Sequence, residues 1–167
     1  MKQTLFEAKY LRLVRDGRWE WVERVNSTGI VVVLAVTDDG RAVLVEQHRA
    51  AVGRRVLDLP AGLAGDEGEE ALEAAAAREL HEEAGYEAAV FERIVDVAPS
   101  PGLSAEVTTL FRARGLRKTG PGGGDASEGI AVHEVPVAEL DAFIAGRLAK
   151  GVLADAKLYA GLYFLER

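Results

Sequence analysis

The chain has 167 residues, of which 49% are apolar and 28% are charged, as expected for one globular domain with a substantial core. A formal net charge of -7 disfavours nonspecific binding to nucleic acid and to anionic membranes, whereas a small anionic ligand needs only a local arginine cluster or a metal ion. The absence of cysteine excludes disulfides, zinc–thiolate sites and cysteine nucleophiles. No apolar run approaches the roughly 18 residues of a membrane span, and the charged start MKQTLFEAKY is not a secretory signal, so we expect a cytoplasmic protein.

The first half of the chain predicts strands joined by tight turns. Residues 9–25, KYLRLVRDGRWEWVERV, contain two alternating segments around an Asp-Gly pair, which is a hairpin signal. Residues 29–49 repeat this design, with a turn at the sequence DDG. The run 30–36 is apolar on both faces, which predicts a central position in a sheet.

The next segment predicts a loop followed by a helix. The loop is LPAGLAGDEGEE, and the helix is expected from about residue 69 to residue 84. Glutamates in its first turn suit the positive N-terminal end, its middle is rich in strong helix formers, and Gly85 ends it.

The rest of the chain predicts further strands within residues 88–98 and 106–116. The stretch KTGPGGGDASEG is expected to be a flexible loop inside the domain, because a strand and two more helices follow, in residues 136–151 and 155–167. The pattern predicts an α/β fold in which a mixed sheet is covered on both sides by helices.

Three carboxylates crowd the predicted helix near its end. Glu79 lies three positions before Glu82 and four before Glu83, so all three fall on or near one face. Such like-charge pairs destabilise an isolated helix by roughly 0.2–0.5 kcal/mol each. A divalent cation among the carboxylates removes this repulsion, and Mg²⁺ prefers oxygen ligands. The alternative is a solvated acidic face, but the preceding Gly-rich loop and the Gly-aromatic ending make the pattern more specific than three glutamates.

This pattern resembles the Nudix box, written G-x5-E-x7-R-E-U-x-E-E-x-G-U, where U is a bulky apolar residue. The matching residues are Glu70, Arg78, Glu79, Leu80, Glu82, Glu83, Gly85 and Tyr86. The match departs in one place, because Gly62 precedes Glu70 by eight positions instead of six. We interpret this as a two-residue insertion in the loop, which leaves the helix in register.

The resemblance implies a Nudix-type α/β/α sandwich spanning residues 1–167 as a single domain, with residues 1–25 as an N-terminal antiparallel hairpin extension that forms a homodimer. It also implies hydrolysis of a nucleoside diphosphate linked to another group, with Mg²⁺ or Mn²⁺ as cofactor. The implied metal ligands are Glu79, Glu83, Glu82 as a shared or water-bridged ligand, and the carbonyl of Ala61. The implied structural residues are Gly62, Gly85, Glu70 and Arg78, the last two as an ion pair.

Two further segments resemble the ADP-ribose pyrophosphatase branch of the family. The first, VEQHRAAVGRRVLDLPAG, implies that Arg49 contacts a substrate phosphate, although Arg49 also suits a surface charge at a strand end. In this segment His48 replaces an aromatic residue and Asp58 replaces a glutamate. The second, SPGLSAE, follows the box at the distance typical of this branch and implies roles for Ser104 and Glu106.

The resemblance also implies a glutamate general base on a loop. Glu128 is the first candidate, Glu106 the second and Asp125 the third, and Glu83 is counted with the catalytic residues. The alternative for Glu128 is a solvent-exposed loop position. Trp21 is a candidate for stacking on the adenine, and packing in the core or at a dimer interface is the alternative.

Together these features predict a metal-dependent enzyme that cleaves ADP-ribose, or a close nucleoside diphosphate sugar, to AMP and a sugar phosphate. Other substrates of the family stay open, namely NADH, flavin adenine dinucleotide, GDP-mannose, dinucleoside polyphosphates and oxidised nucleotides. A module that senses a nucleotide without cleaving it, and an acidic helix that serves only solubility, are the alternatives from other classes.

Overall fold

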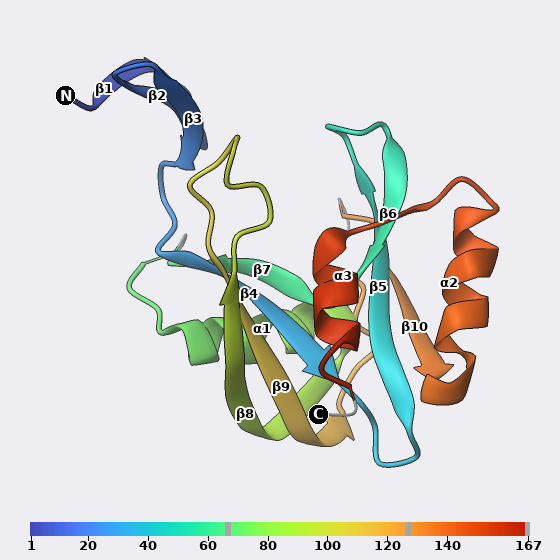
Figure 1. Cartoon of the computed structure of the whole chain (residues 1–167). Helices are drawn as coiled ribbons and strands as arrows, with labels where there is room; N and C mark the ends of the chain where they lie inside the picture. The colour runs from blue at the N-terminus through green and yellow to red at the C-terminus, as the bar shows by residue number, and fades with distance from the viewer. Residues whose placement is uncertain (66–67, 126–127, 166–167) are drawn as a thin grey trace.

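The computed structural model describes residues 1–65, 68–125 and 128–165. Its strands and helices follow one another in the mixed α/β order that the sequence predicts (Figure 1). In chain order they are β1 (Gln3–Glu7), β2 (Leu11–Asp16), β3 (Trp19–Arg24), β4 (Gly29–Ala35), β5 (Arg41–Arg49), β6 (Arg54–Asp58), β7 (Ala61–Ala64), α1 (Leu72–Ala84), β8 (Tyr86–Val97), β9 (Thr108–Lys118), β10 (Ala131–Pro136), the 3-10 helix η1 (Val137–Glu139), α2 (Leu140–Leu148), β11 (Leu153–Ala154) and α3 (Ala156–Leu162).

The body of the molecule contains two four-stranded sheets with the orders β7-β4-β9-β8 and β10-β5-β6-β11. Both are mixed, because β4 pairs with β9 and β6 pairs with β11 in parallel, whereas the other pairs are antiparallel. The predicted mixed sheet is therefore confirmed, and it is divided into two.

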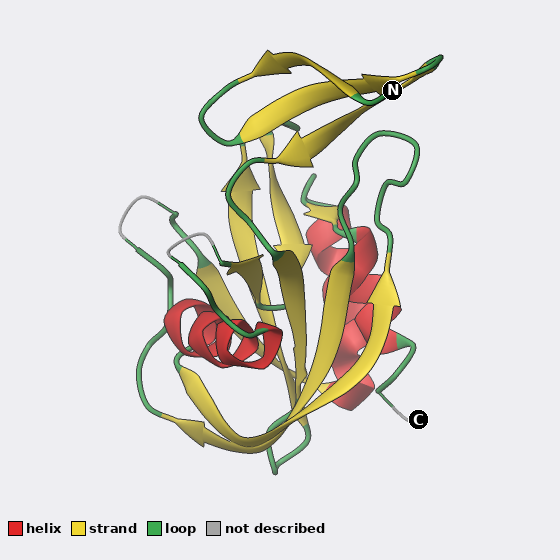
Figure 2. Ribbon diagram, turned by 90° about the vertical axis from the view of Figure 1, so that its left-hand side faces the viewer, coloured by secondary structure: helices red, strands yellow, loops and turns green. Residues whose placement is uncertain are grey.

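Helices cover the sheets from both sides, α1 from one and α2 with α3 from the other (Figure 2). Strand β4 lies between these layers, so its alternate side chains reach two separate cores. Val31 and Val33 pack with α1 residues such as Leu80, whereas Val32 and Leu34 pack on the opposite side. This double coverage explains why β4 is apolar on both faces, and it confirms the predicted central strand.

The N-terminal strands form a separate antiparallel sheet, β1-β2-β3, that projects from the body (Figure 1). The predicted hairpin is β2–β3, and β1 is an additional strand whose residues are all exposed. Main-chain bonds join β3 to the loop after β8, because Val22 N–H donates to the Leu103 carbonyl at 2.9 Å and Ala105 N–H donates to the Val22 carbonyl at 3.0 Å. In the described part of the chain, no helix is long and apolar enough to cross a membrane.

The segment between β6 and α1 differs from the sequence prediction. Residues 61–64 were expected to lie in a loop, but they form β7, which pairs with β4. The helix α1 begins at Leu72 instead of residue 69, because Ala71 has an extended backbone with φ -70 and ψ 145. Glu70 therefore lies before the helix, where its side chain can turn back towards Arg78. Residues 66 and 67, in the loop with the interpreted insertion, lie outside the described residues.

Candidate active site

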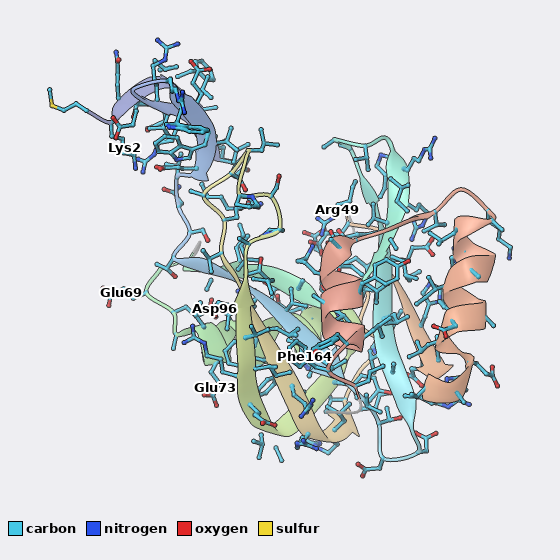
Figure 3. All side chains as sticks on the ribbon, in the orientation of Figure 1. Lys2, Arg49, Glu69, Glu73, Asp96 and Phe164 are labelled. Carbon is cyan, nitrogen blue, oxygen red and sulfur yellow. The ribbon has the colours of Figure 1, made fainter. Side chains whose placement is uncertain are left out.

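A cleft of 790 Å³ opens between the two sheets, α1 and the start of α3. Its walls come from segments that are far apart in the sequence. Seven of the candidate residues line it, namely Arg49, Ala61, Gly62, Glu79, Glu83, Glu106 and Glu128. Figure 3 shows Arg49 near the upper ends of β5 and β6, whereas Glu69 and Glu73 lie at the left of the view, away from Arg49.

Glu83 is the most buried carboxylate of the cleft, with 5% of its surface exposed. The Ala61 N–H donates to its Oε2 at 2.9 Å, and Gln47 Nε2 donates to its Oε1 at 3.4 Å. Burial, together with the negative charges of Glu79 and Glu128, raises the pKa of Glu83 to about 8. The surroundings of Glu83 therefore favour either protonation of its carboxylate or the binding of a cation to it.

Glu79 lies directly against the backbone of β7. A Cβ atom on Gly62 would be 2.5 Å from Glu79 Oε2 and closer still to the other carboxylate atoms. Glycine at position 62 is therefore what lets the carboxylate of α1 reach the loop side of the cleft. This contact explains why the motif needs a glycine at position 62, whatever the length of the loop between Gly62 and Glu70.

Arg78 holds this end of the site together. Its Nε and Nη2 donate to the two oxygens of Glu70, both at 3.1 Å, and Nη2 also donates to the Leu63 carbonyl at 2.8 Å. Its Nη1 donates to Glu79 at 2.8 Å and to Glu82 at 3.2 Å. The structure contains the predicted Arg78–Glu70 pair, and these bonds connect α1 to the segment before it and to β7.

Glu82 is placed differently from its two neighbours. Its side chain is 52% exposed, bonds to Arg78 and does not line the cleft. The structure therefore brings only Glu79 and Glu83 of the three carboxylates to the cleft wall.

The residues present fit a hard divalent cation that is bound together with a substrate. Among the described residues, no three acidic or histidine side chains converge closely enough to hold an ion alone. Mg²⁺, however, is usually held by one or two carboxylates and completes its shell with water and substrate phosphates. Glu79 and Glu83 supply two such carboxylates on one wall, and the burial that raises the pKa of Glu83 makes a positive partner there favourable.

The two loop glutamates have different partners. Glu106 is bound by Arg24, whose Nε lies 2.8 Å from Oε1, so this carboxylate is already paired with a cation of β3. Glu128 accepts a hydrogen bond at Oε2 from the Asp125 N–H at 2.9 Å. Both lie in the cleft, and the negative charge of Glu128 contributes to the raised pKa of Glu83.

Ser104 and Trp21 do not line the cleft of this chain. Ser104 forms a parallel bridge with Val22, and within the described residues its buried Oγ has no hydrogen-bond partner. The Trp21 Nε1 donates to Glu23 at 2.8 Å, and its ring lies below the Lys2 ammonium at 5.9 Å.

Sequence reasoning missed an ion-pair cluster beside the cleft. Lys157 Nζ lies 3.0 Å from Asp58 Oδ2 and 2.6 Å from Asp155 Oδ2. Asp58 is buried, and this burial raises its pKa to about 6. Lys157 and Asp155 line the cleft, whereas Asp58 lies behind them and links β6 to α3. No local pattern signals such a cluster, because Asp58 lies far in sequence from Asp155 and Lys157.

Known families and proteins resemble this chain over most of its length. Residues 27–162 match the model of the NUDIX domain family. A protein named ADP-ribose pyrophosphatase from Mycobacterium tuberculosis (strain ATCC 25618 / H37Rv) is 35% identical over 141 residues, which are 84% of this chain and 66% of that protein. A second protein with that name, from Bacillus subtilis (strain 168), is 36% identical over 121 residues, which are 69% of this chain and 64% of that protein. This chain thus spans slightly less than two thirds of each of these two relatives.

Two further matches extend over nearly the whole chain. The methanol dehydrogenase activator of Bacillus methanolicus is 35% identical over 171 residues, covering 98% of this chain and 89% of the relative. A solved structure described as an ADP compounds hydrolase superposes with a TM-score of 0.66 at 18% identity, covering 90% of this chain and 92% of the other. The latter match shows the same fold and agrees with the predicted α/β/α architecture.

Proposed function

The chain belongs to the NUDIX domain family, and we propose that it is a metal-dependent pyrophosphohydrolase that cleaves ADP-ribose to AMP and ribose 5-phosphate. The observation that carries the proposal is the pair Glu79 and Glu83 on one wall of a cleft that also contains Arg49 and Glu128. The cleft volume of 790 Å³ suits a ligand of this size. Two relatives named ADP-ribose pyrophosphatase support the choice of substrate.

In this mechanism the chain positions the diphosphate and the attacking water. Bound Mg²⁺ or Mn²⁺ supplies positive charge that neutralises the diphosphate and stabilises the developing negative charge. Glu79 and Glu83 would hold the metal, with the Ala61 carbonyl and a water-bridged Glu82 as further ligands. Arg49 would bind a phosphate oxygen by a charge-assisted hydrogen bond.

The general base would be Glu128. Its carboxylate would accept a proton from water as the water oxygen bonds to phosphorus and the bridging P–O bond breaks, leaving the electron pair on the departing phosphate. Glu106 is the second candidate, and it is the weaker one because its carboxylate already accepts a hydrogen bond from Arg24. Asp125 is the third candidate, and its main chain already serves Glu128.

We also propose that the chain acts as a single domain in a homodimer built through the N-terminal sheet. Two large side chains of this sheet, Phe6 and Trp19, are about two-thirds exposed at 65% and 66%, which favours a partner surface. Trp21 and Ser104 would then contribute to nucleotide binding across the interface. A cytoplasmic location stays a prediction from the sequence.

The first experiment is incubation of the purified protein with Mg²⁺ and a panel of diphosphate-linked nucleotides, with chromatographic separation of the products. ADP-ribose is expected to be cleaved fastest, with AMP as a product. Glu83→Gln is expected to lower kcat by on the order of a hundredfold, as for loss of one charge-stabilising group. Glu73→Gln is the matched control, because Glu73 lies on the exposed side of the same helix.

Other outcomes of this panel decide between the alternatives. Faster cleavage of NADH, flavin adenine dinucleotide, GDP-mannose or a dinucleoside polyphosphate would contradict the assignment of ADP-ribose as substrate. It would still support metal-dependent hydrolysis of a diphosphate. Nucleotide binding without turnover supports a sensing module instead.

A second candidate function is activation of an alcohol dehydrogenase, favoured by the match to the methanol dehydrogenase activator over 98% of this chain. The test measures the rate of a purified methanol dehydrogenase with and without this protein. An increase that Glu83→Gln abolishes would connect such activation to the same cleft, and no increase would reject it.

A further inference from the structure

The glycine-rich segment after β9 is bound to the C-terminal end of α1. Gly123 N–H donates to the Glu83 carbonyl at 2.8 Å, and Gly124 N–H donates to the Glu82 carbonyl at 3.0 Å. The last four carbonyls of an α-helix have no partner inside the helix, so these bonds satisfy main-chain groups of the carboxylate cluster itself. Gly123 and Gly124 are thus hydrogen-bonded to the helix, within the stretch that the sequence predicts to be a flexible loop.

Only glycine allows this approach. The φ angles of Gly122, Gly123 and Gly124 are 66°, 109° and 65°, in a region that other residues rarely adopt. A Cβ atom on Gly122 would lie 2.5 Å from the carbonyl carbon of Ala84 and 2.6 Å from the carbonyl oxygen of Glu83. These are main-chain atoms of the helix, which cannot move aside as a flexible side chain can.

The same segment contacts the carboxylate of Glu128. A Cβ atom on Gly124 would collide with this carboxylate and would lie 2.9 Å from Ile130 Cδ1. The next residue, Asp125, donates its N–H to Glu128 Oε2 at 2.9 Å. Main-chain contacts therefore lead without a break from the Glu82 carbonyl, through Gly124 and Asp125, to the Glu128 carboxylate.

We propose that residues 122–124, here called the glycine clamp, are positioning residues that set the place of the Glu128 carboxylate relative to Glu79 and Glu83. The inference rests on the proposed function, because it takes Glu128 as the general base. The metal-holding carboxylates lie on α1 and Glu128 lies on a loop that follows β9, so a direct bond between loop and helix fixes their separation. A misplacement of about 1 Å can lower a catalysed rate by about a hundredfold.

The clamp also lowers the electrostatic cost of the carboxylate cluster. The C-terminal end of a helix carries partial negative charge, which disfavours carboxylates there. Glu82 and Glu83 lie in the last turn of α1, and the amides of Gly123 and Gly124 point at that end. The clamp therefore both places the base and makes the helix end more tolerant of negative charge.

The kinetic test compares Gly122→Ala and Gly124→Ala with the control Gly120→Ala. Gly120 belongs to the same loop, but its φ is not positive and an added Cβ atom would meet nothing within 4 Å. The two clamp variants are expected to lose on the order of 10- to 100-fold in kcat, with KM and the Mg²⁺ dependence within about threefold of the parent protein. Gly120→Ala is expected to behave as the parent protein does.

A double-mutant cycle separates positioning of the base from a merely structural role. In the Glu128→Gln background, Gly124→Ala is expected to cause no further loss of kcat, because both changes act through the same carboxylate. Independent losses that multiply in the double variant would overturn the proposal, as would clamp variants with unchanged kcat. Urea unfolding of each variant verifies that the kinetic effects are measured on folded protein.

Amide hydrogen exchange tests the clamp without reference to catalysis. The amides of Gly123 and Gly124 are expected to be protected in the parent protein and to exchange at least about tenfold faster in Gly122→Ala. Inactivity of the parent protein on every nucleotide would refute the proposed function, while protected amides would still demonstrate the anchoring. Unprotected amides in an active parent protein would refute the clamp alone.

Discussion

The buried pair of Asp58 and Lys157 makes a prediction that depends on pH. In the variant Lys157→Met the aliphatic part of the side chain is retained and the ammonium is lost. Asp58 is 3% exposed, and Lys157 Nζ, at 3.0 Å, is the cation that faces it. Asp155, the other carboxylate of the cluster, opposes ionisation of Asp58. In the variant, Asp58 must therefore either remain charged without compensation or bind a proton.

The sign and size of the effect follow from the pKa of Asp58. In the parent protein burial raises this pKa from 3.8 to about 6, so the folded state binds the proton more tightly than the unfolded state. Stability from this group therefore falls as pH rises from about 4 to 6, and then levels off once both states are ionised. Without Lys157 the folded pKa rises further, so the fall continues at about 1.4 kcal/mol per pH unit.

The expected destabilisation of Lys157→Met is therefore close to zero at pH 5 and about 2–3 kcal/mol at pH 8, given that burial raises a carboxyl pKa by about 3–5 units at most. Loss of the partly exposed pair with Asp155 adds well under 1 kcal/mol. This total lies near the lower end of the roughly 3–5 kcal/mol that breaking a buried ion pair usually costs.

The assay is urea unfolding of both proteins at pH 5 and pH 8, with the free energy of unfolding extrapolated to zero denaturant. The control makes the same Lys157→Met change in an Asp58→Asn background, where the titrating group is absent and the destabilisation relative to Asp58→Asn should be equal at the two pH values. An equal loss at pH 5 and pH 8 would refute the reasoning, and so would a double variant that keeps the pH dependence.

Two further predictions concern the carboxylate cluster. Gly62→Ala should displace the Glu79 carboxylate, because the new Cβ atom overlaps it, and so weaken Mg²⁺ binding by on the order of tenfold in a calorimetric titration. The control is Gly102→Ala, where an added Cβ atom meets nothing within 4 Å and binding should be unchanged. Equal Mg²⁺ affinities of the two variants would show that the contact between Gly62 and Glu79 does not matter for binding. Arg78→Met should lower the free energy of unfolding by about 1–2 kcal/mol, because it removes both hydrogen bonds to Glu70, and Mg²⁺ should restore part of this loss. Thermal unfolding with and without Mg²⁺ measures the effect. If Mg²⁺ does not stabilise the variant, repulsion among the remaining carboxylates is not the cause of the loss.

The parts of the fold that the sequence predicts are those set by local spacing. The register of α1 places Glu79 and Glu83 one turn apart whatever packs around them, so their approach is readable from the chain. The residues of β4 are apolar on both faces because both faces are buried, so the sequence predicts a central strand. These features need no knowledge of distant segments.

The features that the sequence does not predict depend on tertiary pairing. Strand β7 has the sequence AGLA, whose alanine and glycine have weak strand propensity, and it is a strand because β4 pairs with it. Gln47 reaches Glu83 of α1 from strand β5, and Lys157 reaches Asp58 of β6 from helix α3. The residues of the glycine clamp suggest flexibility because their sequence does not reveal which carbonyls their amides meet.

The arrangement of charge at the end of α1 accounts for the crowding of glutamates there. Mutual repulsion and the helix dipole both oppose carboxylates in the last turn. Arg78 compensates Glu79 and Glu82, and the clamp amides compensate the main-chain carbonyls. Glu83 accepts hydrogen bonds from neutral groups, the Ala61 N–H and the Gln47 amide, and its burial raises its pKa to about 8. Because Arg78 already bonds to Glu79 and Glu82, a cation entering the cleft with a diphosphate should act first on Glu83, and its binding should stabilise α1 more than any other helix.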